Sequence, residues 1–98
     1  MEAIMRIQDV FKANEKEIVI GGTNSNYNKL SAKEIRQKIG RQIEVHHPSG
    51  LVSRIPVANV EVSDSLLGQK NIFILLPSES FVTKVQEGAF VYSLSVSE

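Results

Sequence analysis

The apolar residues of this chain recur at every second position or in short unbroken runs, except in one segment. Ile43 and Val45 alternate with polar residues, which is typical of a strand with one buried face. The run from Asn71 to Leu76 is apolar almost throughout and predicts a strand buried on both faces. Between these runs, His47–Gly50 has proline second and glycine fourth, which indicates a type I turn. The pattern favours an all-β architecture with one helical interruption.

The strands can be assigned from these runs and from the turn residues that separate them. Pro56 lies within the fourth expected strand and cannot donate to a ladder, so we expect it at an edge or a bulge. In the last strand, Phe90 and Tyr92 share one face, and the Phe90 ring is assigned to the core. In chain order, the expected strands cover residues 4–11, 17–20, 42–46, 51–62, 71–76, 81–85 and 89–96.

The helical interruption has defined ends. Ser31 and Glu34 have the spacing of a capping box, in which each side chain accepts from the other residue's backbone amide. Ile35 lies at the fourth helical position, where it forms a hydrophobic staple with the residue before the cap. Gly40 supplies the C-terminal stop. We therefore expect one short helix over residues 32–39.

A chain of 98 residues accommodates one domain. We interpret residues 1–98 as a single closed barrel of roughly six or seven mostly antiparallel strands. Residues 24–40 are interpreted as a helical insert, and residues 95–98 as a loose C-terminal tail. The expected core comprises Ile7, Val10, Ile18, Ile20, Ile43, Val45, Val60, Ile72, Ile74, Leu76, Val85 and Val91.

The composition excludes several classes of site. The chain has no cysteine, so it can form neither a disulfide nor a thiolate metal site. Eleven basic and eleven acidic residues give zero net charge, which removes any general attraction to nucleic acid. No apolar run approaches the roughly 18 residues of a membrane span, and residues 1–6 lack the pattern of a signal peptide. We expect a cytoplasmic, soluble protein with no membrane partner.

No catalytic pattern is present. His46 and His47 are the only histidines, and adjacent strand residues point to opposite faces, so they do not form a metal site together. The serines lack the sequence context of a nucleophile. No phosphate-binding loop of the form G-x-x-x-x-G-K-[ST] occurs, so we expect no GTP binding. The sequence predicts a protein that is not an enzyme and that carries no cofactor and no metal.

Several motifs resemble the second domain of elongation factor Tu and its relatives. The hexapeptide IQDVFK at residues 7–12 is similar to the opening strand of that domain, and residues 18–22 are similar to the hairpin strand that ends in glycine. The segments at residues 40–45, 68–72 and 85–88 are similar to three later motifs in the same order. The resemblance implies a translation-protein β-barrel, present here as a stand-alone copy without the GTPase domain.

In that family, the domain contacts the aminoacyl end of tRNA, ribosomal RNA or a neighbouring domain. The resemblance therefore implies a non-enzymatic binding module linked to RNA or to the translation machinery. This chain departs from the family at residues 21–23, where glycine, arginine and valine are usual, and at residues 24–39, which replace a shorter loop. The zero net charge and the few aromatic rings indicate an alternative, a protein adaptor with no nucleic-acid role.

The densest basic stretch lies in and after the expected helix. Lys33, Arg36, Lys38 and Arg41 are the candidate partner-binding residues, and the first three are expected to point outward from the helix. The alternatives are a solvated helix face and a plug over one end of the barrel. The sequence leaves open whether the partner is a protein or an RNA, and it leaves the oligomeric state open.

Overall fold

The computed structural model describes residues 2–77 and 86–94. These residues form eight strands, one α-helix and one 3₁₀-helix. In chain order the elements are β1 (Glu2–Arg6), β2 (Asp9–Lys12), β3 (Glu17–Thr23), η1 (Ser25–Tyr27), α1 (Ala32–Ile39), β4 (Gln42–His46), β5 (Val52–Pro56), β6 (Asn59–Asp64), β7 (Lys70–Pro77) and β8 (Phe90–Ser93).

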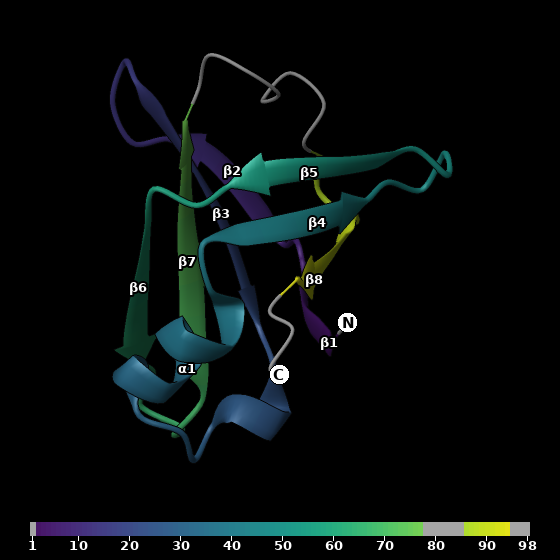
Figure 1. Ribbon diagram of the computed structural model, residues 1–98. Helices are drawn as coiled ribbons and strands as arrows, with labels where there is room; N and C mark the ends of the chain where they lie inside the picture. The colour runs from purple at the N-terminus through teal and green to yellow at the C-terminus, as the bar shows by residue number, and fades with distance from the viewer. Residues whose placement is uncertain (1, 78–85, 95–98) are drawn as a thin grey trace.

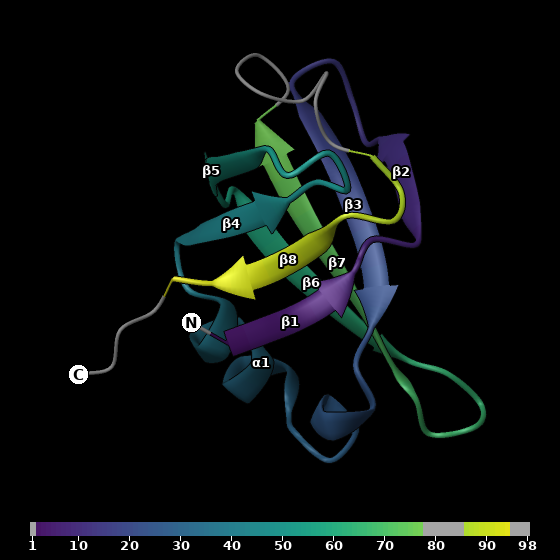
Figure 2. The ribbon, with the colours of Figure 1, turned by 90° about the vertical axis from the view of Figure 1, so that its right-hand side faces the viewer.

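The strands form two antiparallel sheets of four strands each. One sheet has the order β1-β8-β4-β5, and the other has the order β2-β3-β7-β6. Figure 1 shows β4 and β5 running across the direction of β6 and β7, and Figure 2 shows β1, β8 and β4 in front of the other sheet. The inner faces of the two sheets enclose the core between them.

The chain passes from one sheet to the other within two residues after β1. The Ile7 amide donates to the Ala89 carbonyl beside β8, whereas the next amide, of Gln8, donates to the Gly21 carbonyl of β3. Consecutive residues therefore bond to different sheets. The expectation of one continuous strand over residues 4–11 is wrong, because the chain bends at this corner and forms β1 and β2.

A second corner lies after Pro56, which ends the edge strand β5. The Val57 amide donates to the Arg41 carbonyl, and the Ala58 amide donates to the Leu75 carbonyl of β7. The edge position expected for Pro56 is confirmed. The single strand expected over residues 51–62 is wrong, since its two halves, β5 and β6, belong to different sheets.

Helix α1 occupies the expected residues, and both halves of the capping box are present. The Glu34 amide donates to Ser31 Oγ at 3.1 Å, and the Ser31 amide donates to Glu34 Oε1 at 2.9 Å. Ile35 and Ile39 are fully buried. The helix packs against β6 and β8, and Ser93 Oγ of β8 donates to the Lys38 carbonyl in its last turn. This bond satisfies a carbonyl that has no partner within the helix.

The expected core is mostly correct. Val10 and Ile18 are only half-buried, and Val85 lies outside the described residues. Tyr27 is a core residue that the sequence did not predict, because η1 turns its ring inward. The fully or largely buried residues of the expected set are Ile7, Ile20, Ile43, Val45, Val60, Ile72, Ile74, Leu76 and Val91.

The assignment of Phe90 to the core is wrong. In β8 the inward positions are Val91 and Ser93, so alternation points Phe90 to the outside, where it is 47% exposed. At the inward position of Ser93, the hydroxyl donates to the Lys38 carbonyl of helix α1.

The all-β class and the single α-helix are confirmed, and the strand pairing is antiparallel throughout the described residues. Among these residues the two sheets have no strand in common, so closure of a barrel stays a prediction. The strand expected over residues 81–85 and the tail at 95–98 lie outside the described residues.

Candidate functional site

The outer face of the β1-β8-β4-β5 sheet carries the rings of Phe90, Tyr92 and His46 and two arginines. Cross-strand partners share a face, so the register defines which side chains lie side by side. One row crosses the sheet as Arg6, Phe90, His46 and Val52, and the row beside it as Ala3, Tyr92, Glu44 and Arg54. We call these eight residues the outer face. Their sequence neighbours Met5, Val91 and Val45 point into the core.

Phe90 occupies the middle of the first row. Its strand partners are Arg6 on one side and His46 on the other. The His46 and Tyr92 rings lie 4.4 Å apart between centroids, at 48° to each other. Three rings thus lie on neighbouring positions of two strands, with Arg6 and Arg54 at the two sides of the sheet. These rings suit a planar ligand, and Arg6 at the edge adds a cation for an anionic group.

Glu44 is buried at the centre of the outer face, with 9% of its side chain exposed. His46 Nε2 lies 2.7 Å from one carboxylate oxygen, and Arg54 Nε donates to the other at 3.2 Å. A carboxylate can only accept, so His46 carries its proton on Nε2. The His46 hydrogen bond lowers the pKa of Glu44 below its ordinary value of 4.5; burial opposes this shift, and the Arg54 hydrogen bond adds to it.

This shift predicts a contribution of Glu44 to stability that depends on pH. A carboxylate whose pKa is lower in the folded state stabilises the fold fully above its unfolded pKa and loses that contribution as pH falls through the folded value. We expect Glu44→Gln to be less stable than wild type at neutral pH and to lose less stability than wild type in acid. Thermal unfolding across a pH series measures this. If the unfolding temperatures of the two proteins fall equally as the pH is lowered, the assigned role of Glu44 is excluded.

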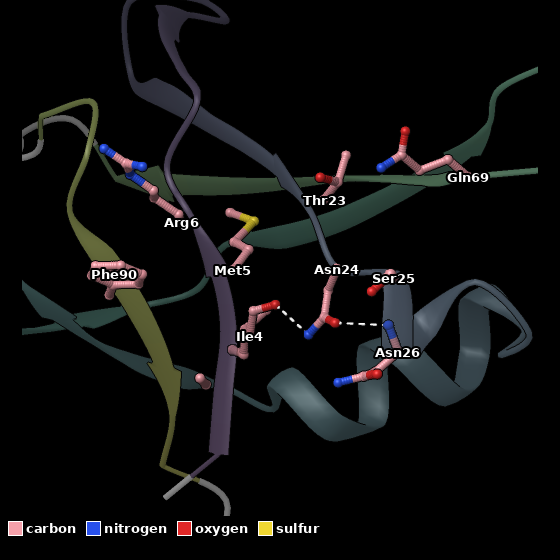
Figure 3. A pocket seen from close by; sticks show the side chains of 10 residues that line it. Ile4, Met5, Arg6, Thr23, Asn24, Ser25, Asn26, Gln69 and Phe90 are labelled. Carbon is pink, nitrogen blue, oxygen red and sulfur yellow. Dashed lines mark hydrogen bonds between the residues drawn. The ribbon is translucent and has the colours of Figure 1, made fainter.

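A groove of about 530 Å³ adjoins the outer face at the edge strand β1. Arg6 and Phe90 line both surfaces, while Thr23, Asn24 and Gln69 line the far side of the groove. Figure 3 shows these side chains around β1, with the Asn24 amide bonded to the Ile4 carbonyl at 2.7 Å. That bond fixes the polar wall of the groove to the strand edge. The groove therefore extends the outer face with neutral polar groups.

The four basic residues predicted as a partner site do not form one surface. Lys33 is exposed, whereas Arg36 Nε donates to the Val60 carbonyl of β6 at 2.9 Å. Lys38 Nζ lies on the opposite flank of the helix, 3.7 Å from Glu2 Oε1 of β1. Arg41 follows the helix and lines a separate hollow near Pro56. Lys33, Arg36 and Lys38 are all exposed, as expected, although Arg36 and Lys38 also contact neighbouring strands. Their role in binding a partner stays a prediction.

Within residues 2–77 and 86–94, no group of three or more His, Cys, Asp or Glu side chains could hold a metal ion. No α-helix in the same residues has the length and apolar character needed to span a membrane.

The outer face could not be predicted from the sequence, because the Phe90 ring was assigned to the core. Residues 89–94 read Ala-Phe-Val-Tyr-Ser-Leu, and either alternating set contains apolar residues. Hydrophobicity therefore favours the larger rings inside, although the structure buries Ala89, Val91 and Ser93. Ala89 and Ser93 are small. Small residues at alternate positions were the one signal in the sequence that the face of β8 carrying them is tightly packed.

Comparisons with protein-family models, with curated proteins and with solved structures found no match to this chain. The resemblance to the second domain of elongation factors therefore rests on the sequence motifs alone.

Proposed function

We propose that this protein is a non-enzymatic binding module whose outer face binds single-stranded RNA. The observation that carries the proposal is the exposed Phe90 ring between Arg6 and His46, next to the Tyr92–His46 ring pair. Unpaired bases stack on aromatic side chains whatever their sequence, and arginines neutralise the backbone phosphates. Because binding is local, it does not require a basic protein overall.

We also propose that the fold is the closed barrel of the elongation-factor family. Each corner supports this, because β1 continues into β2 and β5 continues into β6 while consecutive amides bond to different sheets. Followed through both corners, the pairing runs from β8 through β1 and β2 to β3, β7, β6 and β5, and returns through β4 to β8. Four of the five family motifs overlap strands, namely β2, β3, β4 and β7, and the IQDVFK segment leads into the β2–β3 hairpin.

Phe90→Ala tests the proposed function. Stacking on one ring is worth about 1–3 kcal/mol per base, so we expect affinity for a single-stranded RNA oligonucleotide to fall roughly 5- to 150-fold. Fluorescence anisotropy with a labelled mixed-sequence RNA measures this at low salt. Phe11→Ala is a matched control, because Phe11 is 49% exposed but lies on the other sheet. Equal affinities of the Phe90→Ala and Phe11→Ala variants would contradict the assignment.

A protein adaptor is the second candidate function. Leu51 and Val52 are half-exposed on the β4–β5 hairpin, and Val52 extends the outer face with apolar surface. Apolar area beside rings and arginines is also typical of protein interfaces. A salt titration distinguishes the two, because RNA binding weakens steeply with salt whereas an apolar protein contact does not. Absence of RNA binding even at low salt would favour the adaptor.

A further inference from the structure

The turn between β6 and β7 presents two adjacent leucines to solvent. Leu66 and Leu67 are both fully exposed, so neither side chain contributes to the core. Turn positions of this kind usually carry Gly, Asn, Asp or Ser, which favour the backbone conformation and remain hydrated. Two leucines at such a site add nothing to folding and expose apolar surface. A contact outside this chain accounts for them.

Four backbone amides of the turn are bonded within it. The Gly68 amide donates to the Ser65 carbonyl, and the Ser65 amide donates to the Gln69 carbonyl. Ser65 Oγ accepts from the amides of Leu67 and Gln69. A protein pocket can offer partners to free amides, but the apolar part of a lipid layer offers none. A turn with these four amides already bonded is therefore suited to insertion into lipid.

The same end of the molecule carries cations. Figures 1 and 2 both show the β6–β7 turn at the same end as η1, α1 and the loop between them. Lys29 lies in that loop and Lys33 on the first turn of α1, and neither forms an ion pair among the described residues. The turn is also tied to the loop, because the Lys70 amide donates to Asn28 Oδ1. The turn with the two leucines therefore lies beside the loop that carries Lys29.

We propose that this end of the protein binds the surface of an anionic membrane, with Leu66 and Leu67 inserted at the level of the headgroups. Two apolar side chains alone bind membranes weakly, and lysines near the surface add attraction to anionic lipids. This proposal departs from the expectation of no membrane partner, which depended only on the absence of a spanning segment and of a signal peptide. The contact is independent of the outer face and of the proposed RNA binding.

Sedimentation with lipid vesicles tests the proposal. We expect wild type to bind vesicles of phosphatidylcholine mixed with phosphatidylserine, and to bind pure phosphatidylcholine less. Leu66→Ser/Leu67→Ser should bind the mixed vesicles about 10-fold more weakly or worse. Its unfolding temperature should match wild type, because the two side chains touch nothing in the fold. Leu51→Ser/Val52→Ser is the matched control, since it removes two exposed apolar residues from a different hairpin and should bind like wild type.

The charge contribution has its own comparison. Lys29→Gln/Lys33→Gln should lose the preference for phosphatidylserine, whereas Lys12→Gln/Lys16→Gln, on the β2–β3 hairpin, should keep it. Failure of wild type to bind the mixed vesicles at low salt would overturn the proposal and direct the search toward a protein with an apolar pocket. Equal binding by wild type and Leu66→Ser/Leu67→Ser would overturn it as well.

Discussion

Ile74→Ala is expected to destabilise the fold by about 2–5 kcal/mol, because the truncated side chain leaves a cavity that its neighbours only partly fill. Ile74 is fully buried in β7, between its register partners Ile20 of β3 and Val60 of β6. This row of three side chains is the centre of the β2-β3-β7-β6 sheet on its inner face. Chemical denaturation, read as the change in midpoint at constant slope, measures the loss.

Ile18→Ala provides the matched control for Ile74→Ala. Ile18 lies in β3 of the same sheet, but it is only half-buried, so less apolar surface is lost and little cavity forms. We expect its cost to be clearly smaller. If Ile74→Ala unfolds at the same midpoint as wild type, β7 is not the central strand of this sheet.

Gly22→Ala is expected to cost about 1–3 kcal/mol, since it adds a methyl group where no space exists. A Cβ at Gly22 would lie 2.5 Å from the Arg6 carbonyl oxygen and 2.9 Å from the Met5 sulfur. The close approach arises where the end of β1 passes over β3, just before the first corner. The backbone of Arg6 must shift to accept the methyl group, and this shift also displaces the outer face.

Gly21→Ala is the neighbouring control for Gly22→Ala. Its Cβ would lie 3.1 Å from the ring of Phe73, a side chain, and would meet no backbone atom closer than 3.8 Å. A side chain can move a few tenths of an ångström more easily than a strand can, so we expect a smaller loss of stability. Equal losses at Gly21 and Gly22 in thermal unfolding would contradict the close packing of β1 on β3.

The local elements of this fold could be predicted from sequence because their signals are local. The capping box, the stop at Gly40 and the turn at His47–Gly50 each depend on residues a few positions apart. The long apolar run correctly predicted a strand, β7, but the expected burial on both faces is wrong, because Phe73 and Leu75 are only half-buried. The bends after β1 and after β5 could not be predicted, since they depend on bonds to strands far away in the sequence.

The candidate site could be predicted less well than the fold. The basic residues of the helix could be identified in the sequence. The contacts of Arg36 with β6 and of Lys38 with β1 could not, because they depend on how the helix packs against the strands. The outer face depends on the register of β8, and its rings are contributed by strands whose pairing is non-local. A one-residue change of register would exchange Phe90 for Val91 at the surface.

Titration of the isotope-labelled protein with single-stranded RNA, followed by amide NMR signals, tests the central claim most directly. If the outer face binds RNA, the amide signals of Arg6, His46, Phe90 and Tyr92 should shift during the titration and give one common affinity. That affinity should fall as salt is added. Signals around Phe11 on the other sheet should stay in place. Shifts absent from the outer face, or centred on the β2–β3 hairpin, would contradict the account.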